Sequence, residues 1–334
     1  MPQKKDRITI ASVAEHAQVS MMTVSRVVNN RGQVSDAMKQ RVLSAMNELG
    51  YKPNRIARSL ASNKTFKIGV IVPDMSSMFF ASILASIEHI LWEHDYYMVL
   101  CNTGKDERRE QDILDVFEED QVDGVLIFGT HLSHSQLTTL LKNQRAAVVF
   151  NGEVDPKVAG QILLNQSEAI GMAVKHLINV GRTTIGYIDL DQRTYSMRER
   201  RQAFENTTSQ SSVKSWVLES GKENLAPLVR QFLQDYPQTD GIICFNDEMA
   251  VRALVILKDD GKQIPEDIAV IGYDDVKIAT WVTPKLTTIR LKMSISKLGE
   301  LAANMLLDRI EGKGDTNPII LDHELIIRDS TPAL

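Results

Sequence analysis

The sequence predicts a small all-α unit at the amino terminus, followed by an α/β core of two doubly wound parallel-sheet subdomains. Three observations favour this fold class. The first 64 residues are basic and have helical periodicity, strand-like apolar runs alternate with helical stretches from Lys67 onward, and two motifs recur 117 residues apart. A chain of 334 residues with 43% hydrophobic side chains can bury such cores, and its two cysteines suggest no disulfide framework.

Residues 10–30 contain two short helical patterns around a tight turn, with Ser20 as the expected cap of the second helix. A third helix is expected between Ser35 and Gly50. The first two have helix-turn-helix spacing, which would place the second in the major groove of DNA, although a generic three-helix bundle has similar periodicity. The expected buried residues are Ile10, Val13, Ala14, Ala17, Val19, Val24, Val27, Val28, Val42, Leu43, Met46 and Leu49.

The charge distribution favours the DNA-binding alternative. The whole chain has a formal net charge of −5, which alone would argue against a nucleic-acid partner. Residues 1–64, however, hold 11 of the 38 lysines and arginines and four of the 43 acidic residues, so this segment is +7 and the remainder −12. Such asymmetry indicates a polyanion-binding module attached to an acidic domain.

The segment 53–62 predicts a helix that forms only with a partner. Ile56 and Leu60, like Ala57 and Ala61, lie four residues apart, as on one face of a helix. Isolated helices shorter than about 12–15 residues are marginal in water. This segment is therefore expected to act as a hinge that folds when it pairs, rather than as a plain linker.

From Lys67 onward, alternating strands and helices predict parallel sheets covered on both faces. The sequence around Ile68 resembles that around Ile185, and the sequence around Asp123 resembles that around Asp240, both at an offset of 117. A shared offset indicates a duplication that yields two similar subdomains facing a cleft. The expected strands are 68–72, 97–101, 125–128, 147–150, 162–164, 185–188, 213–218, 242–245 and 268–272.

Polar side chains follow several of these strands, at the edge where doubly wound sheets bind ligands. Asp74 and Asp274 can accept hydrogen bonds from hydroxyls, and Arg200, in an expected loop 191–200, can donate them. Aromatic residues nearby suit the apolar ring faces of a small sugar-like ligand. The other candidates from this pattern are Ser77, Phe79, Phe80, Thr130, Asn151, Asn246 and Trp281.

Other functional classes have less support. We find no nucleophile elbow, phosphate-binding loop or zinc-protease motif, so the cleft is predicted to bind rather than catalyse. No cofactor and no metal is expected. A solute-binding protein and an architectural DNA protein are alternatives, opposed by the basic amino-terminal segment and by the polar cleft respectively. No apolar run reaches the roughly 18 residues of a membrane helix and no signal peptide is evident, which predicts a cytoplasmic protein without membrane contact.

The residues 10–30, with V-S-x-x-T-V-S-R-V-V-N, and the later E-L-G-Y-K-P-N resemble the lactose/galactose repressor (LacI) family of transcriptional regulators. The resemblance implies base reading by Met21, Met22 and Arg26, of which only Arg26 can pair with a guanine edge. It implies that the hinge lies in the minor groove, where Leu60 wedges into a central base step. Gln18 stands where the family often has glycine. The other implied DNA contacts are Thr9, Ser20, Thr23, Ser25, Asn29, Asn54 and Ala57.

The resemblance continues through the core. N-D-E-M-A from Asn246, G-Y-D-D from Gly272 and P-K-L-T-T-I from Pro284 match family motifs, and Arg200 aligns with the pocket arginine. The family implies a periplasmic-binding-protein-like core, with Ser196 also lining the effector pocket. Leu291 replaces a frequent glutamine, so the pocket is not a copy of the lactose or purine site.

The expected organisation is a DNA-binding domain at 1–52, a hinge at 53–64 and a core at 65–334. Within the core, one subdomain is expected to comprise 65–163 and 291–325, and the other 164–290. The expected protein is a homodimeric repressor of carbohydrate-utilisation genes that binds a near-palindromic double-stranded operator and responds to a sugar-like effector. Control by a protein or non-sugar corepressor is the open alternative.

Overall fold

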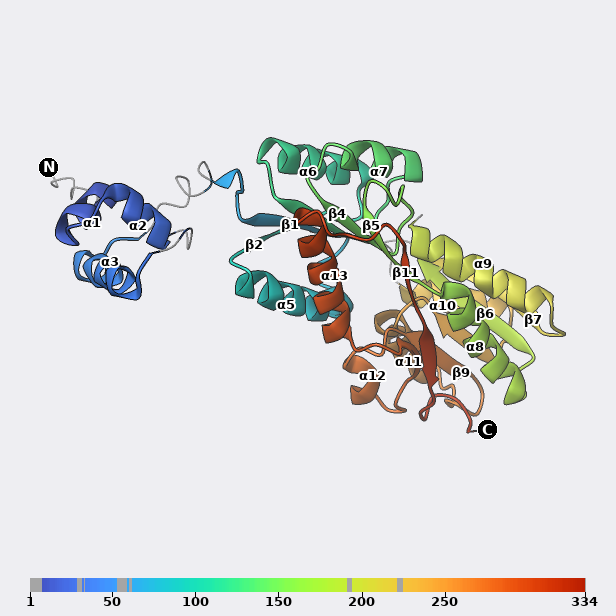
Figure 1. Ribbon diagram of the computed structural model, residues 1–334. Helices are drawn as coiled ribbons and strands as arrows, with labels where there is room; N and C mark the ends of the chain where they lie inside the picture. The colour runs from blue at the N-terminus through green and yellow to red at the C-terminus, as the bar shows by residue number, and fades with distance from the viewer. Residues whose placement is uncertain are drawn as a thin grey trace, which may run out of the picture. The chain divides into compact units, whose positions relative to one another are not determined.

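The computed structural model describes residues 8–28, 32, 34–52, 59, 62–190, 194–220 and 225–333. The chain forms two compact units, Met1–Phe66 and Lys67–Leu334 (Figure 1). Each unit has its own hydrophobic core, which is why each is treated separately below. The predictions for Asn29, Asn54, Ala57 and Leu60 lie outside the described residues.

The first unit contains the three expected helices, α1 (Ile10–His16), α2 (Met21–Val28) and α3 (Asp36–Leu49). The Thr9 hydroxyl caps α1, the Ser20 hydroxyl accepts from the Thr23 amide at 3.1 Å, and Gly50 ends α3 in the left-handed conformation. Ser35 occupies the cap position of α3 without a side-chain cap bond. Local sequence therefore sets the ends of these helices.

The core of this first unit follows the expected apolar pattern with one exception. Val13, Val24 and Val42 are fully buried, one from each helix, so the three helices share one core. Leu43 was expected in the buried stripe of α3, but it is 37% exposed and Ala45 is buried instead. The exception is geometric, because Leu43 lies about 100° around the helix from Val42 whereas Ala45 lies on the same side.

The second unit consists of two six-stranded sheets, which confirms the predicted fold class. The strand order is β11-β5-β4-β3-β1-β2 in the first sheet and β12-β10-β9-β8-β6-β7 in the second. The strands are β1 (Lys67–Val72), β2 (Tyr97–Asn102), β3 (Gly124–Phe128), β4 (Ala147–Phe150), β5 (Gly160–Leu164), β6 (Thr184–Leu190), β7 (Lys214–Ser220), β8 (Gly241–Cys244), β9 (Ala269–Tyr273), β10 (Thr287–Leu291), β11 (Ile319–Leu321) and β12 (His323–Ile326).

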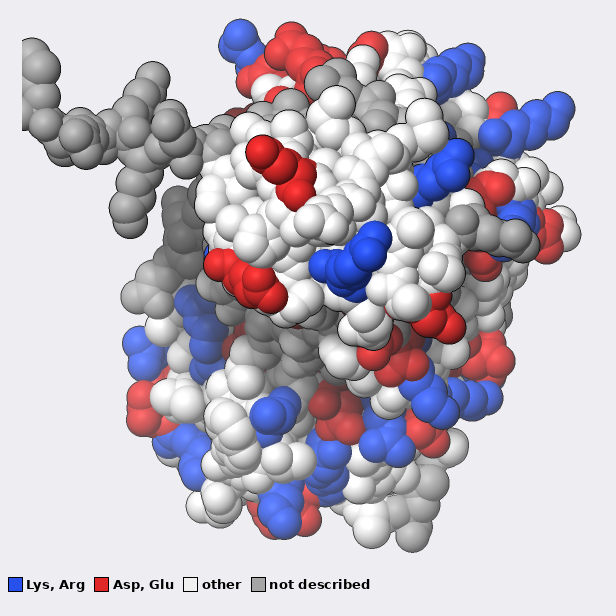
Figure 2. Space-filling view, turned by 60° about the vertical axis from the view of Figure 1, so that its left-hand side comes forward, with Lys and Arg blue, Asp and Glu red and all other residues white. Residues whose placement is uncertain are grey.

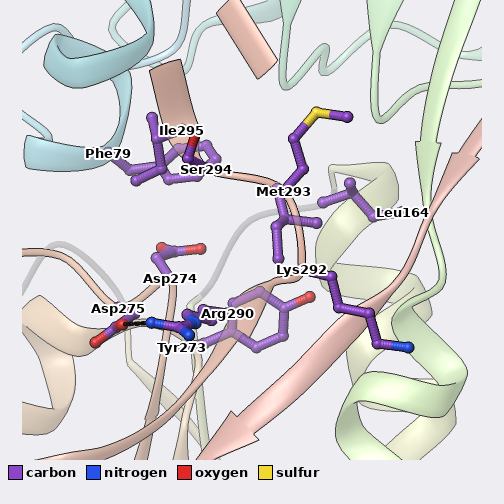
Figure 3. Close-up of a pocket in the computed structure, with 11 residues that line it drawn as sticks. Phe79, Leu164, Tyr273, Asp274, Asp275, Arg290, Lys292, Met293, Ser294 and Ile295 are labelled. Carbon is purple, nitrogen blue, oxygen red and sulfur yellow. Dashed lines mark hydrogen bonds and ion pairs between the residues drawn. The ribbon is translucent and has the colours of Figure 1, made fainter. Parts of the chain in front are cut away.

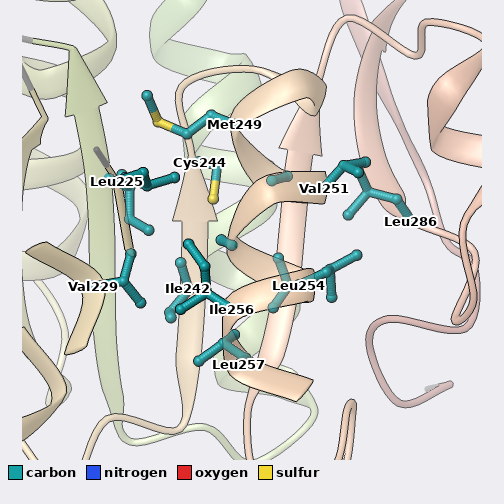
Figure 4. Packing of buried hydrophobic residues seen from close by; sticks show 14 of the residues in the cluster. Leu225, Val229, Ile242, Cys244, Met249, Val251, Leu254, Ile256, Leu257 and Leu286 are labelled. Carbon is teal, nitrogen blue, oxygen red and sulfur yellow. The ribbon is translucent and has the colours of Figure 1, made fainter. Parts of the chain in front are cut away.

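Helices cover both sheets (Figure 1). They are α5 (Met78–Glu93), α6 (Glu107–Glu119), α7 (His134–Leu141), α8 (Gln166–Asn179), α9 (Tyr195–Ser209), α10 (Leu225–Asp235), α11 (Asp247–Asp259), α12 (Ile278–Trp281) and α13 (Ile295–Ile310). In one core of the second half, α11 packs its apolar face on β8 and β9, with Ile242 and Leu254 in its middle (Figure 4). No helix in the described ranges is both long and apolar enough to cross a membrane.

The two halves repeat each other in strand order, but the last strand is parallel in the first sheet (β11) and antiparallel in the second (β12). β1 and β6, which carry the first repeated motif, hold the same position in their sheets, as do β3 and β8. The second motif makes the same backbone bond in both halves, because Asp123 donates to the Lys67 carbonyl at 2.9 Å and Asp240 donates to the Thr184 carbonyl at 3.0 Å. The duplication inferred from the offset of 117 therefore corresponds to equivalent structure.

The chain crosses between the halves three times, and one expected boundary is wrong. The crossings follow β5, β10 and β11. α13 packs against α5 and β3 of the first half and β11 joins the first sheet, but β12 pairs antiparallel with β10 of the second sheet. Residues 323–325 therefore belong to the second half, not to the first as the range 291–325 implied.

Candidate functional site

In the first unit, the outer face of α2 carries the side chains predicted to read bases. Val24 and Val27 point into the core, which leaves Met21 and Met22 exposed by 57% and 64%, with Arg26 exposed beside them. Gln18 has a φ of 51°, so the turn before α2 adopts the left-handed conformation even without glycine. The first turn of α2 and its exposed side chains are therefore accessible to a ligand such as DNA.

The residues predicted to contact phosphates lie near the amino ends of α1 and α2. Thr9 and Ser20 cap these helices, and Thr23 contacts the Ser20 hydroxyl at 2.9 Å. Thr23 and Ser25 are half-buried. Helix amino ends present unpaired amide groups that suit phosphate oxygens.

In the second unit, a cavity of about 280 Å³ lies between the two halves. Its lining comes from the carboxyl ends of β1 and β3 on one side and from the starts of α9 and α11 on the other. This is the edge at which the polar residues were expected. Of the expected effector residues, Asp74, Ser77, Phe80, Ser196 and Asn246 line this cavity.

A second cavity of about 420 Å³ lies beside the crossing after β10. Phe79 and Asp274 line it, together with Leu164, Leu291, Met293 and Ile295 (Figure 3). The crossing segment therefore contributes apolar side chains to the wall of this cavity. Leu291, which replaces a frequent glutamine of the resembled family, contributes to this apolar wall.

Two hydrogen bonds join the halves across the cleft. The Asn151 amide, at the end of β4, donates to the Ser196 hydroxyl in the first turn of α9. The Met78 amide, at the start of α5, donates to Glu248 Oε1 of α11 at 2.9 Å. Both bonds link residues of opposite halves, and Asn151 Oδ1 is buried there without a partner among the described residues.

Arg200 lies in α9, not in a loop as expected, and it is 5% exposed. Its Nε donates to Gln166 Oε1 at 2.9 Å and its Nη1 to the Phe245 carbonyl at 2.6 Å. The guanidinium carbon lies 3.4 Å from the centre of the Tyr273 ring, and Nη2 lies 3.9 Å from Asp274 Oδ1. Arg200 is therefore held rigidly, with its charge directed toward Asp274.

The two expected hydroxyl acceptors differ in protonation. Burial raises the pKa of Asp274 to about 7, although Arg200 opposes this effect. Burial also acts on Asp74, but hydrogen bonds from Ser76 and the charge of Lys105 outweigh it and lower the pKa. At neutral pH, Asp74 is therefore ionised and Asp274 is poised between its two forms.

Four expected effector residues do not line either cavity, namely Thr130, Asn151, Arg200 and Trp281. Asn151 and Arg200 make the contacts described above. Thr130 is buried in the first half, where its hydroxyl donates to Glu110. Trp281 ends α12 and is 69% exposed, outside both cavities. The sequence places Thr130 and Trp281 near strand ends, but side-chain direction turns them away from the cleft.

Sequence reasoning missed several lining residues. Glu248 follows the recognised Asn246-Asp247 pair by one residue, and its role as a helix cap depends on a helix from the other half. Tyr273 belongs to the recognised G-Y-D-D motif, so that motif was an available signal. Asp275 belongs to the same motif. The remaining missed residues with polar side chains are Lys105, His131, Thr194, Arg252, Arg290, Lys292 and Ser294.

Comparison with protein families gives two matches. Residues 9–54 match the model described as bacterial regulatory proteins, lacI family. Residues 174–331 match the model of a periplasmic binding protein-like domain. The matches fall on the helical unit and on the larger unit respectively.

Similar proteins of known name cover almost the whole chain. The HTH-type transcriptional repressor PurR of Aliivibrio salmonicida is 33% identical over 98% of this chain and 99% of its own. The ribose operon repressor of Halalkalibacterium halodurans is 31% identical over 97% of each chain. Both are named as repressors, and the second name specifies a ribose operon.

Solved structures agree on the fold. A LacI-family transcriptional regulator from Silicibacter pomeroyi is 28% identical, with a TM-score of 0.78 over 97% of this chain and 99% of its own. A complex of the transcriptional regulator CelR with cellobiose is 26% identical, with a TM-score of 0.71 over 97% of this chain and 100% of its own. The lac repressor dimer bound to operator superposes with a TM-score of 0.85 over 98% of this chain and all of its own, and at 24% identity it supports the fold alone.

Proposed function

Because this chain belongs to the lacI family of bacterial regulatory proteins and is a DNA-binding transcriptional repressor of that family, we propose that it binds a near-palindromic operator as a homodimer. A small effector that enters the cleft then lowers or raises its affinity for the operator. The protein acts in the cytoplasm. Its operator-reading domain is residues 1–52, its hinge is residues 53–64, and its effector-binding core is residues 65–334. The observation that carries the effector proposal is the polar cavity between two halves that hydrogen-bond across it.

The exposed face of α2 supports DNA recognition. Arg26 can donate two hydrogen bonds to a guanine edge, whereas Met21 and Met22 offer only apolar contacts, for example to thymine methyl groups. The +7 charge of residues 1–64 adds sequence-independent attraction to phosphates. Leu60 of the paired hinges is proposed as the wedge at the operator centre.

Arg26→Ala should reduce discrimination at one base pair per half-site by about 1–3 kcal/mol. The measurement is the relative affinity for all four bases at each position of a site that the wild type selects from a random duplex library. Arg41→Ala is the control, because Arg41 is an exposed arginine of α3 in the same unit. An unchanged base preference in Arg26→Ala would contradict the assigned role.

An exposed apolar surface of the first half supports the homodimer. β2 is the edge strand of its sheet, and all six of its residues are partly exposed. Trp92 of α5 is 60% exposed and lies edge-on to Tyr97 of β2, with ring centres 5.7 Å apart. Figure 2 shows a face on which charged side chains are sparse over part of the upper half of the core. Apolar edge surfaces of this kind usually pair with another chain.

The effector is proposed to be a small hydroxylated molecule, such as a sugar. The cavity offers an ionised Asp74, the Ser196 hydroxyl and the Asn246 side chain, with Phe80 as an apolar wall. The effector is also proposed to reach Asp274, which lines the second cavity. The carboxylate oxygens of Asp274 become full hydrogen-bond acceptors for hydroxyls as the pH rises through about 7. Effector affinity is therefore expected to increase between pH 6 and 8.

A thermal-shift screen with D-ribose, cellobiose and lactose tests the site. Asp274→Asn should lose most of the ligand-induced increase in melting temperature and its pH dependence. Asp112→Asn, an exposed aspartate of α6, should keep both. If Asp274→Asn retains the full increase, the effector does not contact the second cavity; if no compound in the screen shifts the wild type, all three sugars are refuted as effectors.

Closure of the cleft is proposed as the link to DNA. An effector that favours one arrangement of the two halves need supply only about 1–3 kcal/mol of coupling, which is 5- to 150-fold in operator affinity. Linkage requires DNA to change effector affinity by the same factor. Equal operator affinity with and without saturating effector would refute this coupling.

A further inference from the structure

A buried chain of hydrogen bonds runs from Arg200 away from the cleft. Gln166 Oε1 accepts from Arg200 Nε at 2.9 Å and from the Tyr273 hydroxyl at 2.7 Å. The Tyr273 oxygen lies 2.7 Å from His323 Nε2. Because the tyrosine proton is used toward Gln166, His323 must donate from Nε2, and burial keeps this ring neutral by lowering its pKa to about 3.

This hydrogen-bond chain ends at the segments where the backbone passes between the two halves. Gln166 is the first residue of α8, two residues after the end of β5, and His323 is the first residue of β12, two residues after the end of β11. The Asn165 amide donates to the Leu321 carbonyl at 3.0 Å, which ties these two crossings together. The third crossing joins them, because the Lys292 amide donates to the Asp322 carbonyl at 3.0 Å.

Tyr273 couples the two ends of this hydrogen-bond chain mechanically. The Arg200 guanidinium lies on its ring at 3.4 Å, and its hydroxyl holds both Gln166 and His323. In Figure 3 the ring lies beside the crossing residue Lys292, with Asp274 on the cleft side. The four side chains that form this hydrogen-bond chain, those of Arg200, Gln166, Tyr273 and His323, are all buried. Their hydrogen bonds therefore have no competition from bulk water and constrain each other.

We propose that Gln166, Tyr273 and His323 are positioning residues that transmit the placement of Arg200 in the cleft to the three crossing segments. The relative angle of the two halves depends on the backbone of these segments, since they are the covalent links between the halves. A ligand that moves Arg200 would therefore displace Gln166 and Tyr273 with it and shift the balance between open and closed arrangements. This inference rests on the proposed effector role of the cleft.

The test uses hydrogen exchange in the full-length protein without ligand, so it does not depend on the identity of the effector. Tyr273→Phe removes the hydroxyl that holds two neighbours. Tyr187→Phe is the matched control, because Tyr187 is fully buried in the same half and its hydroxyl has no hydrogen-bond partner within the described part of the chain. Tyr273→Phe should accelerate exchange in segments 164–166, 291–293 and 321–323 by about fivefold or more, and Tyr187→Phe should not.

Two further variants distinguish transmission from a purely structural role. His323→Gln retains a donor at the position of Nε2 and should exchange like the wild type, whereas His323→Leu should match Tyr273→Phe. Arg200→Lys cannot reproduce the hydrogen bond from Arg200 Nε to Gln166 Oε1, so it should accelerate exchange at the crossings. In a protein that already carries Tyr273→Phe, Arg200→Lys should cause no further acceleration.

The proposal is overturned if the crossings exchange at the wild-type rate in Tyr273→Phe. It is also overturned if exchange rises equally throughout the core, or if Arg200→Lys and Tyr273→Phe act additively. Failure of the effector proposal has a different signature, in which the crossings respond to these variants but no cleft ligand changes operator affinity.

Discussion

Gly272→Ala is expected to lower the free energy of unfolding of the core by about 3 kcal/mol or more. A Cβ at this position would lie 2.2 Å from Asp247 Oδ1 and 2.7 Å from Leu286 Cδ2. Asp247 cannot move aside easily, because it is fully buried and accepts hydrogen bonds from the Thr288 hydroxyl at 2.5 Å and the Val276 amide at 2.9 Å. The added methyl group therefore both overpacks the site and breaks buried hydrogen bonds.

Urea unfolding of the variant measures this loss directly. Gly171→Ala is the control, because Gly171 lies within α8 and the nearest atom to its added Cβ is Thr207 Oγ1 at 3.8 Å. Alanine in a helix interior should stabilise that variant by roughly 0.5–1 kcal/mol. A loss below about 1 kcal/mol in Gly272→Ala would mean that Asp247 relaxes without cost and that its bonds do not hold the β9 end in place.

Local signals predicted most of the fold. The apolar runs fall on the strands β1 to β9, because buried parallel strands require continuous hydrophobic stretches. Ser20 and Gly50 lie at helix ends as predicted, since capping depends on adjacent residues. β10, β11 and β12 were not predicted as strands of particular sheets. Their assignment depends on which half each segment joins, and short segments at crossings carry no pattern that specifies this.

The candidate site was predictable as a location but not in its contacts. Polar residues after parallel strands meet at one edge, so Asp74 and Asp274 were found from spacing alone. Glu248 was missed because its partner, the Met78 amide, lies 170 residues away in the other half. Thr130 and Trp281 were expected in the cleft because sequence distance to a strand end does not give side-chain direction.

The environment of Arg200 illustrates the same limit. The sequence supplies an arginine near a pocket, for which an exposed side chain is the ordinary expectation. The structure buries it between Tyr273, Gln166 and the Phe245 carbonyl, three groups from three separate elements. Only the folded arrangement brings these groups together, so both its stabilising role and its link to His323 were invisible beforehand.

Arg200→Ala should therefore lower the free energy of unfolding by about 3–5 kcal/mol at neutral pH and abolish the ligand response of the cleft. The variant loses two hydrogen bonds and the stacked contact with Tyr273, and it leaves Asp274 without its compensating charge. Urea unfolding measures the first effect and ligand-induced thermal shift the second. Arg252→Ala replaces an exposed arginine at the rim of the 280 Å³ cavity and should leave stability nearly unchanged.

The dependence of this loss on pH identifies its electrostatic part. Asp274 has a pKa of about 7 in the folded state against 3.8 when unperturbed, so the wild type loses stability as the pH rises from about 4 to 7. Arg200 lowers that pKa, and its removal raises the pKa further and extends the loss above pH 7. The difference between variant and wild type should thus grow from pH 7 to 9, and Arg200→Ala combined with Asp274→Asn should not show this growth. A difference independent of pH would assign the role of Arg200 to packing and hydrogen bonding alone.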